Sequence, residues 1–205
     1  MMNKSIQPTI RSIFGEEAFE HGLFYVHDES LRFELSGGGE SYIESFQQAY
    51  TKALLILETT FRRSPDLRAC ISFYGGKTLV SNLSVFKGLS ACEIGIPKNY
   101  CEAWRTAVED EEDYYRHFIT FPANRSLMRR LVWSATARDL GVRPSASCDV
   151  YLYSIKSEIL AHPYDDRGMD IIGRNKALKQ QLYQQYHDDL LRYDLAEMER
   201  HYGAS

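Results

Sequence analysis

The chain has 205 residues, of which 44% are hydrophobic and 25% are charged, and its formal net charge is −4. A chain of this length forms one domain with a substantial apolar core, and its composition excludes an intrinsically disordered protein. The acidic balance argues against a general nucleic-acid binder, and no apolar run approaches the roughly 18 residues that a membrane-spanning helix needs.

The first elements in chain order are a short helix and a β-hairpin. Apolar residues at helical spacing predict a helix over residues 3–14, within an N-terminal helical extension covering residues 1–20. Two short runs rich in β-forming residues, 23–26 and 31–35, flank a polar turn at 27–30. Their spacing and the residues of the turn predict two paired strands.

The best-defined helix follows a run of glycines. Ser41 and Glu44 form an S-x-x-E capping box, in which each side chain satisfies the other residue's free backbone N–H. Apolar side chains then recur on one helical face, and Pro65 disfavours helical geometry in the residue before it. A helix is therefore expected over residues 41–62, followed by a strand over 67–74.

Strands and helices alternate in the rest of the chain. We expect strands at 115–121, 148–155 and 159–161 and helices at 125–140 and 175–193. Asn175 is placed to cap the last of these helices, and Asp194 with Glu197 forms a capping pair for a short final helix. The pattern predicts a single domain of the α+β class, with helices packed against a mainly antiparallel sheet.

The four cysteines, Cys70, Cys92, Cys101 and Cys148, form no C-x-x-C pair. A structural zinc site requires paired ligands at short spacing, so this spacing favours free thiols. The first 14 residues lack the long apolar core and the cleavage site of a signal peptide. We therefore expect a cytoplasmic protein with no cofactor and no bound metal.

The densest cluster of charge is a seven-residue segment, Tyr164-Asp165-Asp166-Arg167-Gly168-Met169-Asp170. As a functional site, Asp165, Asp166 and Asp170 present oxygen ligands to a divalent cation or divide acid and base roles between them. As a structural turn, the aspartates accept backbone N–H bonds, Arg167 pairs with one of them, and Gly168 permits a positive φ. We favour the structural interpretation, because Arg167 neutralises charge that a metal ion needs. We expect the segment at a turn that leads into the C-terminal helices.

A run of five consecutive acids lies earlier in the chain: Glu109, Asp110, Glu111, Glu112 and Asp113. Such a run is commonly a solvated loop or the start of a helix. Acidic side chains also steer association with a basic partner, so this run is the candidate partner-binding surface.

Five arginines give the segment 121–143 a local positive excess: Arg125, Arg129, Arg130, Arg138 and Arg143. This is the nearest approach to a nucleic-acid-binding patch, although arginines on the solvent face of a helix are the commoner case. No complete catalytic or cofactor motif occurs. The glycines and lysine of residues 74–78 lack the first glycine of a phosphate-binding loop.

Residues 163–172 resemble the hallmark of an uncharacterised bacterial domain-of-unknown-function family, whose members carry a Y-D-D-R-G-x-D motif near the C-terminus. The segments 31–35 and 190–194 are similar to the family's pattern as well, and the resemblance spans residues 20–200. The two aspartates at 188–189 depart from it, because relatives tend to carry a tryptophan there. The resemblance implies a small cytosolic bacterial protein without an established activity, and some members lie in toxin–immunity neighbourhoods.

Together these observations favour a cytoplasmic protein-binding module, an immunity protein that neutralises a partner toxin by direct binding. One alternative is a metal- or water-dependent enzyme that uses Asp165, Asp166 and Asp170. A further alternative is a nucleic-acid-binding protein that uses the arginines of residues 121–143. Association with a membrane is not expected.

Overall fold

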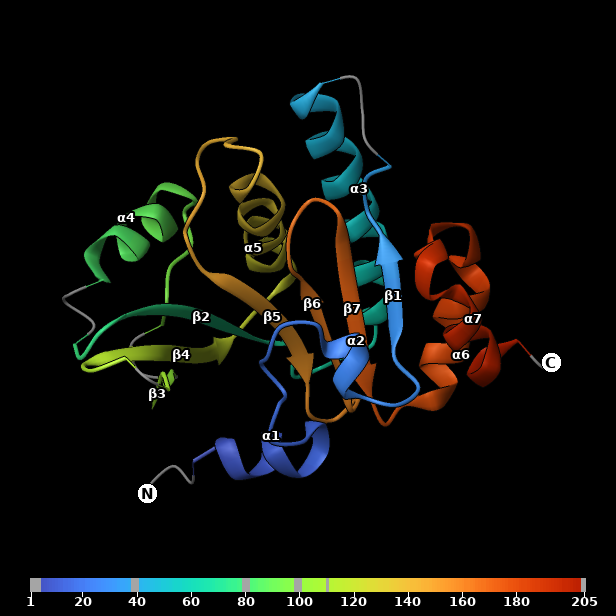
Figure 1. Ribbon diagram of the computed structural model, residues 1–205, viewed down its shortest axis with the longest axis horizontal. Helices are drawn as coiled ribbons and strands as arrows, with labels where there is room; N and C mark the ends of the chain where they lie inside the picture. The colour runs from blue at the N-terminus through green and yellow to red at the C-terminus, as the bar shows by residue number, and fades with distance from the viewer. Residues whose placement is uncertain (1–4, 38–40, 79–81, 98–100, 110, 204–205) are drawn as a thin grey trace.

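The computed structural model describes residues 5–37, 41–78, 82–97, 101–109 and 111–203. Within these residues, seven strands form one antiparallel sheet in the order β1-β7-β6-β5-β2-β4-β3, with helices packed against it (Figure 1). This is the α+β class that the sequence predicts. None of the described helices is long and apolar enough to cross a membrane.

The helices are α1 (Gln7–Phe14), α2 (Leu23–Val26), α3 (Tyr42–Thr60), α4 (Leu83–Ala91), α5 (Arg125–Arg138), α6 (Lys176–Gln185) and α7 (Leu195–Tyr202). The strands are β1 (Leu31–Glu34), β2 (Arg68–Gly76), β3 (Glu102–Ala107), β4 (Tyr114–Pro122), β5 (Asp149–Ser154), β6 (Ile159–Pro163) and β7 (Gly168–Gly173). Short 3-10 helices follow α6 at His187–Asp189 and Arg192–Asp194.

Helix α3 begins where its capping box predicts. The backbone N–H of Glu44 donates to the Ser41 hydroxyl at 3.2 Å, and the backbone N–H of Ser41 donates to the Glu44 carboxylate at 3.0 Å. The predicted cap of α6 also forms, because the Leu178 N–H donates to the Asn175 side chain at 3.0 Å. Both caps satisfy backbone donors that a helix N-terminus leaves free.

The predicted hairpin over residues 23–35 is wrong. Residues 23–26 form the short helix α2, and β1 pairs with β7 instead, with Arg32 opposite Asp170. Gly22 enters α2 with a φ of 64°, and the backbone N–H of Phe24 donates to the Asp170 carboxylate at 3.1 Å. A partner 146 residues away in sequence therefore fixes this segment, and its local pattern carries no sign of it.

The C-terminal region also differs from the prediction. The acidic segment does not lead directly into helices, because β7 lies between them. The helix expected over 175–193 ends at Gln185, and Leu190 then forms a β-bridge with Phe33. Asp194 does not cap α7 with its side chain, which is bonded to Arg32 instead.

The sheet separates two apolar clusters. On one side, α3 and α5 pack behind the strands (Figure 1). Buried residues such as Phe33, Ile71 and Phe121 belong to the apolar cluster on that side. On the other side, α1 and the chain that follows it cover Cys70, Tyr151 and neighbouring side chains. This N-terminal segment lies over the face that carries most of the buried polar groups described below.

The two edges of the sheet differ. The outer edge of β1 is closed by the C-terminal segment, where the Leu191 N–H donates to the Arg32 carbonyl at 2.9 Å. At the other edge, β3 pairs with β4, and no other described strand pairs with it. β3 was not predicted from the sequence.

Candidate functional site

The acidic segment forms the turn between β6 and β7. Asp165 lies at its centre, where its carboxylate accepts the backbone N–H of Arg167 at 2.7 Å and that of Gly168 at 3.2 Å. The Arg167 guanidinium pairs with the second carboxylate oxygen, with its Nε at 2.8 Å. Asp165 is therefore held by donors from its own turn, and Arg167 pairs with an aspartate as expected.

Gly168 is required for space, not for a positive φ. The expected left-handed conformation is absent from this residue. A Cβ atom at Gly168 would overlap the Tyr164 hydroxyl and come within 3.1 Å of the Phe33 carbonyl oxygen. The glycine therefore lets the Tyr164 ring and β1 lie close to β7.

The three aspartates of the segment do not converge on one point. Asp165 binds within the turn, Asp166 accepts a hydrogen bond from Ser36 at 3.3 Å, and Asp170 binds Arg32. Burial and the neighbouring Asp165 carboxylate raise the pKa of Asp166. In the described part of the chain, no group of three or more His, Cys, Asp or Glu side chains is arranged to hold a metal ion.

Asp170 belongs to a buried charge network centred on Arg32. Arg32 donates to Asp170 through Nε at 2.7 Å and Nη2 at 3.0 Å, and to Asp194 through Nη1 at 3.2 Å. Its guanidinium also lies 5.0 Å from the ring centre of Phe24 and 4.5 Å from that of Tyr25. Burial disfavours the charged guanidinium, but its bonds to Asp170 outweigh this effect and raise the pKa of Arg32.

The network joins the three segments that carry the family resemblance. Residues 31–35 supply the arginine, 164–170 supply one carboxylate and 190–194 supply the other. The sequence therefore identified the three segments that supply this network, without showing that Arg32, Asp170 and Asp194 touch one another.

His162 lies next to the network and was missed. It is fully buried, and it pairs in register with Asp170. Its Nδ1 lies 2.9 Å from the Val150 carbonyl oxygen, its ring stacks on Tyr151 at 4.1 Å, and its Nε2 has no hydrogen-bond partner among the described residues. Burial lowers the pKa of His162 to about 4, so the ring is neutral near pH 7. The only signal in the sequence was a histidine inside the apolar run of β6.

A second polar cluster, also missed, lies on the same face of the sheet, with Ser72, Arg116 and Asp149 buried and its N-terminal members exposed. Arg116 donates to Glu20 at 2.5 Å and to Ser72 at 3.3 Å, and Ser72 donates to Asp149 at 3.3 Å. His21 lies 3.3 Å from the same Asp149 oxygen. These contacts, with that of Phe24 to Asp170, tie the N-terminal segment to the sheet. The two clusters therefore hold the fold together with partners inside the molecule.

The acidic run forms the connection between β3 and β4. Glu109, Glu111, Glu112 and Asp113 are exposed, and no ion pair to any of them occurs within the described ranges. Asp110 lies outside the described residues. The four described acids of the candidate binding surface are therefore on the molecular surface.

The five arginines of residues 121–143 do not form an unpaired basic patch. Arg125 donates to the Arg62 carbonyl, Arg129 pairs with Glu58, Arg130 with Glu93, Arg138 with Asp139 and Asp149, and Arg143 donates to Ser145. Neighbouring acids thus pair with three of these side chains, those of Arg129, Arg130 and Arg138.

The comparisons with known proteins agree with the sequence resemblance. A family model described as a domain of unknown function, DUF3885, matches residues 6–194. The chain belongs to this family. The DUF3885 match includes every segment of the Arg32 network, together with α1. The chain is also similar to an uncharacterized protein, YnaE, of Bacillus subtilis (strain 168), with 22% identity over 199 residues that cover 91% of each chain. No solved structure matches it.

Proposed function

We propose that this DUF3885 protein is a cytoplasmic protein-binding module that masks a surface of its partner, as an immunity protein does with a toxin. The proposal rests on a contrast between two groups of carboxylates. The carboxylates of Asp165, Asp170 and Asp194 are buried and bonded to arginines, whereas the described acids of the β3–β4 connection are exposed without a described cation.

Exposed carboxylates of one sign create a negative potential that speeds encounter with a basic surface. Aromatic anchors lie beside them, because the Tyr74 ring stacks on that of Tyr114 at 6.2 Å at the base of the β3–β4 connection. Tyr74 is 42% exposed. A tyrosine at this position offers apolar contact area and a hydroxyl, the combination that is enriched in interface hot spots.

The test is a charge reversal in the connection, Glu111→Lys with Glu112→Lys. The matched control, Asp188→Lys with Glu199→Lys, makes the same change of net charge at exposed sites in the C-terminal region. A protein partner is first isolated by affinity purification, with the tagged wild-type chain as bait, from cells that naturally produce this chain. We expect the connection variant to associate with this partner about tenfold more slowly at low salt, with little change in the control.

Two results would contradict the proposal. One is that the wild-type chain retains no stoichiometric protein partner. The other is that both variants associate with the partner at the wild-type rate. A loss of folding is checked separately by thermal unfolding, and none is expected, because these side chains are exposed.

A further inference from the structure

Among the described residues, β3 is the edge of the sheet with no strand paired on its outer side. Its residues Ala103, Arg105 and Ala107 are exposed. An edge strand presents unpaired backbone N–H and C=O groups to an added strand from another chain. The opposite edge offers no such template, because the C-terminal segment bonds to β1 there.

The side chains of β3 point alternately to the two faces of the sheet. In the pairing with β4, Trp104 lies opposite Phe118 and Ala103 lies opposite Ile119. Phe118 belongs to the apolar cluster beneath α1, whereas Ile119 belongs to the cluster on the helix-covered side. A strand added to β3 has the same alternation, so its successive side chains meet two different surfaces.

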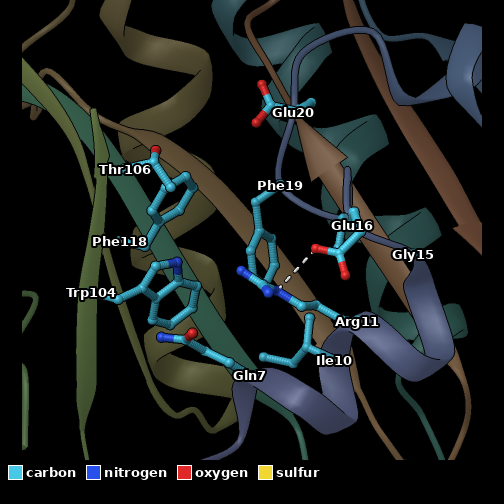
Figure 2. Close-up of a pocket in the computed structure, with 11 residues that line it drawn as sticks. Gln7, Ile10, Arg11, Gly15, Glu16, Phe19, Glu20, Trp104, Thr106 and Phe118 are labelled. Atoms are coloured by element: carbon cyan, nitrogen blue, oxygen red, sulfur yellow. Dashed lines mark ion pairs between the residues drawn. The ribbon is translucent and has the colours of Figure 1, made fainter. Parts of the chain in front are cut away.

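The surface on the α1 side is a small pocket with aromatic walls (Figure 2). The Trp104 ring stacks on Phe118 at 5.3 Å, and Phe19 lies 6.1 Å and 6.2 Å from these two rings. Figure 2 shows the Arg11 guanidinium beside Phe19, paired with Glu16 at 3.2 Å. Aromatic faces and carboxylates both attract cations, so this pocket suits a lysine or arginine side chain.

The ion pair that holds the Arg11 guanidinium beside this pocket is weak. The side chains of Arg11 and Glu16 are 51% and 75% exposed, and exposed ion pairs contribute little to stability. An arginine or lysine from a partner therefore exchanges with Arg11 at small cost.

The surface on the other side of β3 is an apolar groove between the strand and α4. It is lined by Phe86, Leu89, Ile94, Ile96, Ala103 and Ile119. Few polar groups interrupt this lining, so the groove suits aliphatic or aromatic side chains.

The acids of the β3–β4 connection lie at the end of the same strand. Ala107 ends β3, and the exposed Glu109, Glu111, Glu112 and Asp113 follow it. A segment that runs along β3 therefore begins beside the groove and ends beside these carboxylates. This charge complementarity selects a basic segment over an acidic one.

We infer that β3 receives an extended segment of a partner protein as an added strand, in which basic residues alternate with apolar residues. The basic side chains enter the Trp104–Phe118–Phe19 pocket and face the acidic connection, and the apolar side chains enter the α4 groove. This inference rests on the proposed protein-binding function and specifies how the partner is held.

The experiment uses a displayed library of random twelve-residue peptides against the full-length chain. We expect enriched peptides to alternate basic and apolar residues, and to slow hydrogen exchange of the β3 amides when bound. Ala103→Asp places a charge at the groove and should weaken these peptides by about tenfold or more. Arg11→Ala removes the internal competitor and should tighten their binding roughly threefold.

The inference is overturned if no peptide is enriched, if enriched peptides bind the Ala103→Asp variant as well as the wild type, or if the β3 amides exchange unchanged. Ala103 is exposed, so the variant is expected to fold, and its melting temperature verifies this. The two proposals fail separately. A native partner that is sensitive to Glu111 and Glu112 but indifferent to Ala103→Asp would leave protein binding in place and exclude strand addition.

Discussion

At the residue scale, Arg32 connects carboxylates that lie 138 and 162 residues away in the chain. It is 7% exposed, Asp170 is fully buried and Asp194 is 8% exposed. Because these charged groups are buried, water contributes little to stabilising them. Each charge is therefore stabilised mainly by the opposite charges of the network. The most distinctive segment of the family is residues 164–170. Two of its aspartates make contacts that stabilise the fold, Asp165 within its own turn and Asp170 in the Arg32 network.

We predict that Arg32→Ala destabilises the fold by roughly 3–5 kcal/mol, because it leaves the Asp170 carboxylate buried without its guanidinium. Chemical denaturation measures this loss. Arg129→Ala is the matched control, since both partners of the Arg129–Glu58 pair are exposed, 56% and 37%, and an exposed pair contributes little to stability. Equal losses for the two variants would show that the Arg32 network is no more important than a surface pair.

At the element scale, sequence predicted the elements whose signals are local. The Ser41–Glu44 box located the start of α3, and runs of β-forming residues located the strands β5 and β6. The strand pattern failed for α2, whose first turn is held by Asp170, and it did not detect β3. Contacts between distant segments determine these elements, and one sequence shows its residues without showing which of them meet.

In the candidate site too, some features are visible in the local sequence and others depend on contacts between distant residues. The sequence located both acidic segments, because consecutive charges are visible without a structure. It did not show that one is bonded internally and the other is exposed, since this depends on the contacts of Arg32 and Arg167. The aromatic pocket was missed because Phe19, Trp104 and Phe118 come from three separate segments of the chain.

The β6–β7 turn provides a prediction at this scale. Gly168→Ala should destabilise the fold by about 1–3 kcal/mol, because its Cβ overlaps the Tyr164 hydroxyl and forces the ring to move. Adding Tyr164→Ala to this variant opens the space. The double variant should therefore lose less stability than the two single losses combined, when all three are compared by denaturation. Simple additivity would mean that the two side chains do not compete for this space.

At the scale of the whole molecule, the N-terminal segment covers one face of the sheet, and the helices α3 and α5 cover the other. The two edges of the sheet differ from each other. The C-terminal segment closes β1, so within the described residues the unpaired edge of the sheet is β3, which lies beside two pockets and the acidic connection. Buried polar groups lie together beneath the N-terminal segment, and we expect one of them, His162, to make the stability of the fold depend on pH.

His162 sets the direction of that dependence. Desolvation by burial lowers its pKa from 6.5 to about 4, although the nearby Asp149 and Asp170 carboxylates act to raise it. Between these two pH values, the unfolded chain binds a proton that the folded chain does not. The stability associated with the neutral ring is therefore present above pH 6.5 and is lost as the pH falls toward 4.

The predicted loss over this interval is on the order of 3 kcal/mol for this one group. Carboxylates titrate in the same range, so the test compares slopes of unfolding free energy against pH and not single values. His162→Phe keeps a ring that can stack on Tyr151 and removes the titrating nitrogen, so its slope between pH 6.5 and 4 should be shallower than that of the wild type. If His162→Phe keeps the wild-type slope, the buried ring does not remain neutral in the folded protein.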